Sequence, residues 1–463
     1  MTASSFFFCG IGGSGMLPLA CIVRAGGATV AGSDRALDAG RLGAKFAFLE
    51  AQGIALHPQD GSGLEPGMTL VTSAAVESTI PDVARAHALG LPHLTRPQLL
   101  AQLLNAADHS VAVGGTSGKS TVTGMIGWML HETGARPTVM NGAVMKNFVS
   151  ADTPFASALI GDSGLFVSEV DESDGSIALY RPGVALLNNV SLDHKEMDEL
   201  RSLFGGFLSA AGKAVVNLDD AESRGIAEAL ETCIGYGFDQ PGAVVRGSDL
   251  RLDIDGSRFT VEAEGQHCEV TLPVPGRHNA QNALGALAAI HALGHPLAPA
   301  AAALARFEGL KRRLETVGTA GGVTVIDDFA HNPDKIAATL ATLTASAQRL
   351  LIFFQPHGYG PLAKMGDELA ATFAHGLRPG DRLLLSDPVY QGGTVDRKRG
   401  SDWLAQAVRA AGGDAEHITE RPAIGARLLE LARPGDRIAI LGARDDTLSE
   451  FAGELVGNLA ARC

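Results

Sequence analysis

The sequence has few aromatic residues and no excess of positive charge. Aromatic side chains make up 5 % of the 463 residues, and 37 basic residues stand against 51 acidic ones, so the formal net charge is −14. Binding along a nucleic-acid backbone needs a basic face, and a platform for single-stranded bases needs clustered aromatic rings. The composition therefore predicts a protein that does not bind nucleic acid.

Cysteines are scarce, and long apolar runs are missing. The five cysteines form no CxxC pair, so neither a zinc site nor a disulfide framework is indicated. No stretch approaches the roughly 20 apolar residues that span a bilayer. The run Phe6-Phe7-Phe8 is also too short for the core of a signal peptide. We expect a cytoplasmic protein with reduced thiols and no membrane partner.

Short apolar runs alternate with Ala- and Leu-rich stretches almost throughout the chain. This rhythm is typical of βα units around mostly parallel sheets. Between about 243 and 275 polar and apolar residues alternate instead, which predicts an antiparallel patch. The runs that we expect to form buried strands are 6–9, 111–113, 165–170, 184–188, 215–217, 323–326, 350–354, 382–385 and 438–441.

Two breaks in this pattern predict domain boundaries. The polar stretch 105–109 precedes a new strand, and the stretch 309–314 lies between an Ala-rich helix and a glycine-containing turn. At roughly 150 residues per domain, the length leaves room for about three domains. The predicted domains are therefore residues 1–107, 108–312 and 313–463.

The first glycine-rich turn suggests a site for a pyrophosphate. Gly10, Gly12 and Gly15 form a GxGxxG pattern after the strand 6–9 and before a helix. Glycines there let backbone N–H groups approach a pyrophosphate at the helix N-terminus. Asp34 follows the next strand, about where an acidic group would meet a ribose hydroxyl. The pattern alone fits either the cofactor of an NAD-dependent dehydrogenase or a UDP-sugar.

The second glycine-rich turn, GGTSGKST at residues 114–121, has the context of a phosphate loop. It follows an apolar strand and precedes an apolar helix, although a strict Walker A motif would have glycine where Val113 stands. In such a loop Lys119 neutralises charge on the outer phosphates, and Ser120 or Thr121 can hold Mg²⁺. GTPases, transporters and kinases share this loop, so it predicts nucleotide binding without specifying a reaction.

Potential metal ligands follow two later strands. Glu169 lies in the run SEVDESDGS at the end of one apolar strand, and His194 closes the run NNVSLDH after the next. Strand ends face the ligand crevice of open α/β sheets, and a carboxylate there can hold Mg²⁺. Each run alone also fits a solvated loop. Together with the phosphate loop they favour a metal site of Ser120, Glu169 and His194.

Two further segments carry candidate nucleotide contacts. Asn279 and Asn282 are three residues apart in a segment that opens a helix, so they share a face on which paired amides can read an adenine edge. Helix capping is the alternative role for Asn279. Arg313 and Asp328 flank an apolar strand of the third part, where a structural arginine and a strand-end cap are the alternatives.

Taken in order, these motifs resemble those of the Mur ligase family, the ATP-dependent amide-forming enzymes of peptidoglycan synthesis. The resemblance implies an α/β fold of three domains. They are a Rossmann-like UDP-sugar-binding domain, a central P-loop ATPase-type domain and a Rossmann-like C-terminal ligase domain. The motifs that carry the resemblance are GIGGSGM, GTSGKST, SEVDESDGS, NNVSLDH, GRHNAQNA, KRRLE and DDFAHNPDK.

The resemblance also implies a reaction. ATP phosphorylates the lactyl carboxylate of UDP-N-acetylmuramate to an acyl phosphate, which L-alanine or a related amine attacks to form an amide. A ligase that adds a preformed murein peptide during cell-wall recycling and a non-catalytic UDP-sugar-binding paralogue remain open. The implied partners are UDP-N-acetylmuramate and an amino acid or short peptide, with ATP and Mg²⁺ as cofactors. The expected assembly is a monomer or a weak homodimer.

Residue roles follow from the same resemblance. The catalytic residues would be Lys119, Glu169, His194, Arg313, Asp328 and His331. ATP would be bound by Gly115, Thr116, Gly118, Lys119, Ser120, Thr121, Asn279, Asn282, Arg313 and Asp328. The UDP-sugar would be bound by Gly12, Gly13, Ser14, Gly15, Met16, Asp34, Ser73 and Arg96. The metal would be held by Ser120, Glu169 and His194.

Some positions depart from the pattern of the alanine-adding branch. Ser117 stands where that branch usually has histidine, Glu196 where it has aspartate, and residues 442–446 differ from its usual glycine-aspartate run. No lysine occurs at residues 203–207, which fits the alanine-adding and peptide-recycling branches. These departures bear on the identity of the amine substrate more than on the type of reaction.

Overall fold

The computed structural model describes residues 4–74, 76–192, 195–253, 255–345, 348–389, 397, 399–443, 445 and 447–462. In this part of the chain the strands form three sheets. None of the helices described is both long and apolar enough to cross a membrane. The chain divides into a first compact unit, Met1–Leu250, Arg258–Pro273 and Asn279–Glu308, and a second, Arg251–Ser257, Val274–His278 and Gly309–Cys463.

The first sheet confirms the Rossmann-like N-terminal domain. Its strands are β1 (Ser5–Cys9), β2 (Thr29–Ser33), β3 (Ala55–His57), β4 (Thr69–Thr72) and β5 (His93–Thr95). They run in the order β3-β2-β1-β4-β5, and neighbours pair in parallel. The accompanying helices are α1 (Met16–Ala25), α2 (Arg35–Asp38), α3 (Gly43–Ala51), α4 (Pro81–Ala88) and α5 (Arg96–Ala106).

The second sheet forms the central domain. Its strands are β6 (His109–Gly114), β7 (Thr138–Met140), β8 (Ala158–Leu159), β9 (Leu165–Glu169), β10 (Val184–Leu187), β11 (Lys213–Asn217), β12 (Ile234–Phe238), β13 (Val245–Asp253), β14 (Gly256–Ala263) and β15 (Gln266–Leu272). Their order is β15-β14-β13-β12-β11-β10-β6-β9-β7-β8. Its helices are α6 (Lys119–Glu132), α7 (Met197–Ser209), α8 (Ala221–Ala227), α9 (Arg277–Ala292) and α10 (Leu297–Leu304), with the 3-10 turns η1 (Lys146–Phe148) and η2 (Ser176–Leu179).

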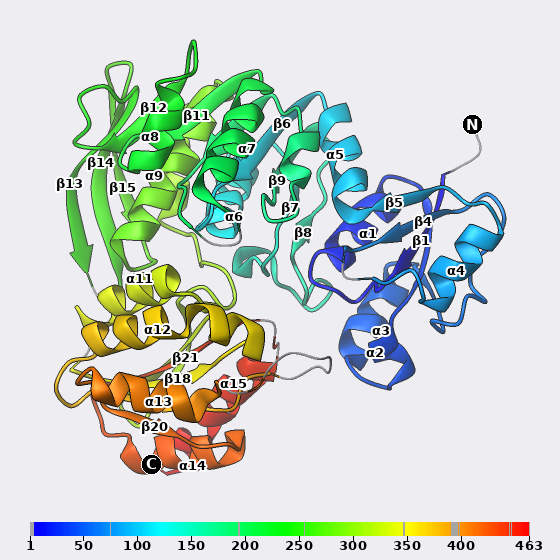
Figure 1. The fold of residues 1–463 in the computed structure, drawn as a ribbon. Helices are drawn as coiled ribbons and strands as arrows, with labels where there is room; N and C mark the ends of the chain where they lie inside the picture. The colour runs from blue at the N-terminus through cyan, green and yellow to red at the C-terminus, as the bar shows by residue number, and fades with distance from the viewer. Residues whose placement is uncertain are drawn as a thin grey trace. The chain divides into compact units, whose positions relative to one another are not determined.

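The polar–apolar alternation correctly predicted one antiparallel part of this sheet, whereas the antiparallel pairing of β7 with β8 was not predicted. β13, β14 and β15 are neighbours in the sheet, and only two residues of chain separate each from the next. So short a connection joins only antiparallel strands. These hairpins form the outer edge of the sheet (Figure 1). From β13 to β7 the remaining neighbours pair in parallel.

The third sheet belongs to the second unit and confirms a Rossmann-like C-terminal domain. Its strands are β16 (Glu315–Ala320), β17 (Val323–Asp328), β18 (Arg349–Gln355), β19 (Arg382–Leu385), β20 (Ala415–His417) and β21 (Asp436–Gly442). The order is β16-β17-β21-β18-β19-β20, with only the β16–β17 pair antiparallel among the pairs described. Its helices are α11 (Pro333–Thr344), α12 (Tyr359–Gly376), α13 (Ser401–Ala410), α14 (Arg421–Leu431) and α15 (Thr447–Ala460).

Alternate residues of β18 enter two different cores. Leu350, Ile352 and Phe354 pack into a cluster with α11, α12 and α13. Leu351 and Phe353 pack with α14 and α15 instead. Because successive side chains of a strand point to opposite faces, helices cover both faces of this sheet.

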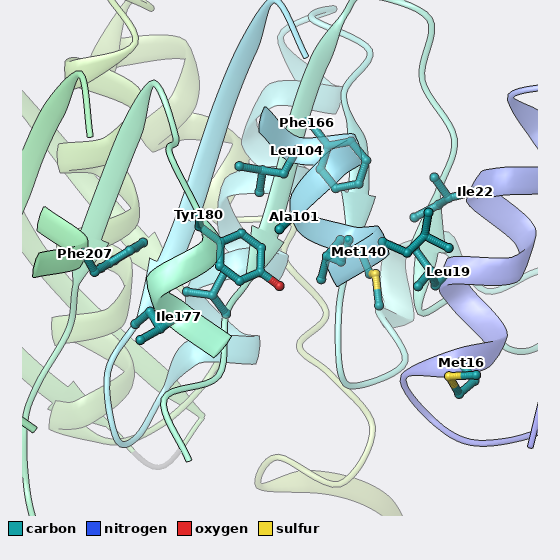
Figure 2. Close-up of a cluster of buried hydrophobic side chains, with 14 of the residues drawn as sticks. Met16, Leu19, Ile22, Ala101, Leu104, Met140, Phe166, Ile177, Tyr180 and Phe207 are labelled. Atoms are coloured by element: carbon teal, nitrogen blue, oxygen red, sulfur yellow. The ribbon is translucent and has the colours of Figure 1, made fainter. Parts of the chain in front are cut away.

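One apolar core joins helices of the N-terminal domain to the central sheet (Figure 2). Met16 and Leu19 of α1 and Leu104 of α5 belong to the same buried cluster as Phe166 of β9 and Tyr180. Burying one such aliphatic or aromatic side chain stabilises the fold by about 1.5–3 kcal/mol. Apolar packing therefore connects the two domains of the first unit. The exact domain boundaries, after residues 107 and 312, stay predictions.

We predict that Leu104→Ala lowers the free energy of unfolding of the first unit by about 3 kcal/mol, because it leaves a cavity in this core. The measurement is urea-induced unfolding followed by circular dichroism. Leu192→Ala is the matched control in the same unit, since Leu192 is 62 % exposed whereas Leu104 is fully buried. Equal midpoints for the two variants would contradict the role given to this core.

Candidate functional site

The phosphate loop between β6 and α6 requires glycine at Gly118. The backbone there has φ +82°, in the left-handed region. A Cβ atom at this position would lie 2.5 Å from both the Asn188 Nδ2 and the Asn282 Oδ1 atoms. Gly118 therefore serves two purposes: it turns the chain into α6, and it lets the loop approach two buried amides.

Residues that follow β10 hold the phosphate loop in place. Asn189 accepts hydrogen bonds from the N–H of Thr116 on its carbonyl (3.0 Å) and from the N–H of Ser117 on its Oδ1 (2.8 Å). Asn188 Nδ2 donates to the Ser117 carbonyl (2.9 Å). These loop N–H groups are thus used within the protein. The first N–H groups of α6, from Lys119 onward, precede the helical ladder and form the anion-binding end.

Lys119 is held at the loop as a charged ammonium group. Its Nζ donates to the Gly115 carbonyl at 2.6 Å and to Glu172 Oε2 at 2.8 Å. Burial acts to lower the pKa of Lys119, but the carboxylates of Glu172 and Asp171 outweigh it and raise this pKa above its usual value. Glu172 thus forms an ion pair with the same ammonium group that the phosphates of a nucleotide would neutralise.

The structure brings together two of the three predicted metal ligands. Ser120 Oγ donates to Glu169 Oε2 at 2.9 Å, and the N–H of Gly142 donates to Glu169 Oε1. A Cβ atom at Gly142 would clash with that same oxygen, so glycine permits the approach. The third predicted ligand, His194, lies outside the described residues. Within the described ranges, no three His, Cys, Asp or Glu side chains are grouped to hold a metal ion.

Asn279 and Asn282 lie inside α9 and are buried, each 4 % exposed. Asn279 is not the N-cap residue, because α9 already begins at Arg277. The predicted shared face is confirmed by a 3.4 Å hydrogen bond from Asn282 Nδ2 to Asn279 Oδ1. Asn282 Oδ1 also accepts from Asn188 Nδ2 at 2.9 Å. The pair therefore touches the phosphate loop through Asn188, and contact with adenine stays a prediction.

The predicted UDP-sugar residues collect at the carboxyl edge of the first sheet. Asp34 is tied to the turn, since its Oδ2 accepts from the N–H of Gly12 (2.9 Å) and its Oδ1 from the N–H of Ala36 (2.8 Å). Arg96 begins α5 after β5, and its Cδ would lie 3.0 Å from a Cβ at Gly15. The other members also follow strand ends: Gly13, Ser14, Met16 and Ser73.

A series of charges links this edge to the phosphate loop within the first unit. Burial acts to raise the pKa of Asp171, but Lys119, the N–H of Ser173 and Arg96 outweigh it and lower the pKa. Asp171 therefore stays ionised between the two cations. A cation of the N-terminal edge and a cation of the phosphate loop thus both act on Asp171.

The remaining candidates, Arg313, Asp328 and His331, lie in the second unit. Asp328 accepts from the N–H groups of Leu314 (2.7 Å) and Ala330 (2.9 Å), and burial raises its pKa. The Arg313 guanidinium lies 4.8 Å from the centre of the Phe329 ring. The His331 ring stands edge-on to His357, with centroids 4.9 Å apart. Asp328 thus organises the local backbone, and a role of the three toward a nucleotide stays a prediction.

Sequence reasoning did not select several residues that the structure places at the phosphate loop. Glu172, Asn188 and Asn189 stand in the acidic and amide runs that follow β9 and β10, so position after an apolar strand was the available signal. Asn141, whose Nδ2 donates to the Ser120 carbonyl at 2.9 Å, also follows a strand. Tyr236 reaches Asn188 from β12 with no local signal at all.

Comparison with known proteins gives consistent matches along the chain. Family models match at residues 6–108 (Mur ligase family, catalytic domain), 113–290 (Mur ligase middle domain) and 312–444 (Mur ligase, glutamate ligase domain). The UDP-N-acetylmuramate–L-alanine ligase of Streptomyces avermitilis is 35 % identical over 459 residues, covering 95 % of this chain and 94 % of that protein.

Two solved structures resemble the whole fold. The UDP-N-acetylmuramate–alanine ligase of Thermotoga maritima has a TM-score of 0.81 at 24 % identity, covering 99 % of this chain and 100 % of that one. A murein peptide ligase of Psychrobacter arcticus has a TM-score of 0.70 at 25 % identity, covering 99 % of each chain. The first likeness, at its low identity, shows the fold alone.

Three α/β domains with a phosphate loop in the central one define a class of nucleotide-binding α/β proteins. The identity to full-length relatives makes the assignment specific. The chain belongs to the Mur ligase family of ATP-dependent ligases, as its ordered motifs predicted.

We predict that Gly118→Ala weakens the binding of ADP at least tenfold, because its Cβ would displace Asn188 and Asn282. Titration calorimetry measures the affinity. Gly134→Ala is the matched control, because Gly134 has the same φ of +82° but no atom within 4 Å of its Cβ position. Both variants incur the left-handed penalty of about 1–2 kcal/mol in stability. Equal ADP affinities would show that the close approach is unimportant.

Proposed function

We propose that this chain joins L-alanine to the lactyl carboxylate of UDP-N-acetylmuramate at the expense of ATP. One observation carries the proposal. Lys119 and Ser120 of the phosphate loop meet the carboxylates of Glu172 and Glu169 in a chain whose full-length relatives are named UDP-N-acetylmuramate–L-alanine ligases. The loop supplies the ATP site, and the relatives supply the substrate class.

The reaction has two steps. A carboxylate oxygen of the sugar substrate attacks the γ-phosphorus of ATP, and ADP leaves. The amine nitrogen then attacks the carbonyl carbon of the acyl phosphate, loses a proton and expels phosphate. Such phosphoryl transfer is accelerated by positioning and by neutralising charge. In this chain the N-terminus of α6 and the Lys119 ammonium group provide the positive charge.

ATP binding has to exchange one ion pair for another. Lys119 is paired with Glu172, and its side chain is 17 % exposed while that of Glu172 is 6 % exposed. A phosphate that replaces the Glu172 carboxylate keeps the ammonium group neutralised, so Lys119 is not left as an unpaired buried cation. Glu172 would then hold Lys119 in position until the nucleotide arrives.

The residues present fit a Mg²⁺ ion. Mg²⁺ prefers oxygen ligands and is usually bound by one or two carboxylates together with substrate phosphates. Ser120 Oγ and Glu169 Oε2, already 2.9 Å apart, would hold it beside the loop, with His194 as the further predicted ligand. When bound, the ion would neutralise charge on the phosphates.

UDP-N-acetylmuramate is proposed to bind at the carboxyl edge of the first sheet. Gly15 lets the turn before α1 approach the Arg96 side chain, whose positive charge suits a pyrophosphate. This edge by itself also fits the NAD-dependent dehydrogenase reading. That reading gives no role to the phosphate loop, however, and it does not fit the family.

A second candidate is a ligase that adds a preformed murein peptide. The fold likeness to the murein peptide ligase of Psychrobacter arcticus over 99 % of both chains favours keeping it. The two candidates share the phosphate loop and the sugar substrate, and they differ only in the amine. The choice between them therefore depends on an acceptor assay.

Location and assembly remain part of the proposal. Cys9, Cys21, Cys233 and Cys268 are free thiols in the described part of the chain, which supports a reducing compartment such as the cytoplasm. The net charge of −14 supports the absence of a nucleic-acid partner. A monomer or weak homodimer without a membrane partner completes the prediction.

The proposal predicts phosphate release from ATP that requires UDP-N-acetylmuramate and L-alanine. The assay supplies Mg²⁺ and compares single amino acids with murein tripeptide as acceptors. Stimulation by L-alanine supports the proposal, whereas stimulation by the peptide alone would establish the second candidate. ATP and sugar binding without turnover on any acceptor would instead favour a non-catalytic paralogue.

Lys119→Ala is expected to reduce this turnover by about 100-fold or more, because it removes a preorganised positive charge. Steady-state phosphate release gives the measurement. Lys364→Ala serves as the control, since Lys364 is exposed on α12. Undiminished turnover in the Lys119 variant would rule out the phosphate loop as the ATP site.

A further inference from the structure

A chain of buried polar groups extends from β12 to the phosphate loop. Tyr236 is completely buried, and its hydroxyl lies 2.9 Å from Asn188 Oδ1. Asn188 in turn contacts Ser117 of the loop and Asn282 of α9, each at 2.9 Å. Burying a tyrosine hydroxyl and two amides among apolar residues is unfavourable unless each polar atom is paired. The energetic cost of burying this network therefore calls for an explanation.

The pairing fixes the direction of every hydrogen bond at Asn188. The Ser117 partner is a backbone carbonyl, which can only accept, so the atom of Asn188 that faces it is Nδ2. The opposite atom, Oδ1, is then an acceptor, and the Tyr236 hydroxyl must donate to it. Burial raises the pKa of Tyr236 far above its usual value, which keeps the proton on this donor.

Two glycines leave the space that the network needs. A Cβ atom at Gly285 of α9 would lie 2.7 Å from the Tyr236 hydroxyl oxygen. A Cβ atom at Gly118 would lie 2.5 Å from Asn188 Nδ2. Glycine in a helix interior costs about 1 kcal/mol relative to alanine. Gly285 therefore admits the hydroxyl at the expense of local helix stability.

Neighbouring side chains hold the backbone of Asn188. Asn217 Nδ2 donates to the Asn188 carbonyl at 2.7 Å, and Gln281 Nε2 donates to Asn217 Oδ1 at 2.9 Å. Both Asn188 and Asn217 are nearly inaccessible, at 2 % and 4 % exposure. The Tyr236 hydroxyl is thus the donor that sets the side-chain amide of Asn188, while the backbone of Asn188 is held independently.

We propose that Tyr236 is a positioning residue for the ATP site: its hydroxyl orients Asn188, and Asn188 holds the phosphate loop in its nucleotide-binding shape. Tyr236 does not itself touch the nucleotide. The inference rests on the proposed function, because it assumes that ATP binds at the phosphate loop. It goes further in assigning a role to a residue outside every motif of the site.

Removing the hydroxyl leaves Asn188 Oδ1 buried without its donor. A buried acceptor without a donor costs more stability than the removal of both hydrogen-bonding partners. We therefore expect the Asn188 side-chain amide to rotate or the phosphate loop to shift. Nucleotide binding would then select a loop shape that is only partly populated, and the apparent affinity falls by that fraction. The amide of Ser117, held by Asn189 Oδ1 at 2.8 Å, should exchange its hydrogen faster.

The test compares Tyr236→Phe with Tyr180→Phe in the full-length chain. Tyr180 is also fully buried in the first unit, but its hydroxyl contacts the Pro97 carbonyl at 3.5 Å and lies outside the network. Both variants lose one buried hydroxyl, so they control for stability. We expect ADP affinity, measured by titration calorimetry, to fall about tenfold for Tyr236→Phe only, which is the factor that about 1.4 kcal/mol produces.

Two further readouts separate positioning from a merely structural role. Hydrogen exchange followed by mass spectrometry should accelerate in peptides covering residues 114–122 for Tyr236→Phe and stay unchanged there for Tyr180→Phe. In the ligase assay the KM for ATP should rise about tenfold with a smaller change in kcat. Gly285→Ala, which keeps the hydroxyl but crowds it, should act in the same direction and serves if Tyr236→Phe does not fold.

The outcomes are distinct. Wild-type protein that binds ADP, with Tyr236→Phe binding as tightly and exchanging as slowly as Tyr180→Phe, would overturn the inference and leave the proposed function intact. Wild-type protein that fails to bind ADP or ATP would overturn the proposed function itself. Weaker ADP binding with faster exchange confined to the loop would support both.

Discussion

The parallel pairing of β6 with both β9 and β10 is the constraint on which the site depends. In this register Gly114 pairs with Leu187 and Val113 with Glu169. The phosphate loop, the acidic run after β9 and the amide run after β10 therefore leave the sheet side by side. Lys119 can meet Glu172 only because the backbone ladder has already brought their segments together. Main-chain hydrogen bonding, which is indifferent to charge, thus gathers charges that would otherwise stay solvated.

The loop itself is shaped by the protein before any ligand binds. Its turn is set by Gly118, its backbone is bonded to Asn189, and its underside rests on Asn188. An electrostatic site acts efficiently when its dipoles need no reorganisation during the reaction. This preorganisation costs stability elsewhere. The buried amides must all have hydrogen-bond partners, and a glycine within a helix is needed to make room for Tyr236.

Much of the fold could be predicted from the sequence, because continuous apolar runs are a local signal of buried parallel strands. The strands around Phe7, Val111 and Phe353 are examples, and alternation correctly marked the antiparallel hairpins. Prediction was weaker where partners are distant in sequence. Asn279 fits a helix cap by its residue type, but the helix begins two residues earlier and buries it. Glu172 reads as one more acid of a solvated loop until Lys119 is placed beside it.

The order of the domains, the phosphate loop and the family could be recognised from the sequence, because they depend on short motifs and on the order of those motifs along the chain. Which members of those motifs contact one another depends on the packing of the strands and helices. Through this packing Glu172 pairs with Lys119, Asp34 accepts a hydrogen bond from the backbone of Gly12, and Tyr236 contacts Asn188 beside the loop. The reason is physical: hydrogen bonds between side chains depend on positions fixed to within a few tenths of an ångström. Such positions are set by how strands and helices pack, and no local pattern of residues encodes them.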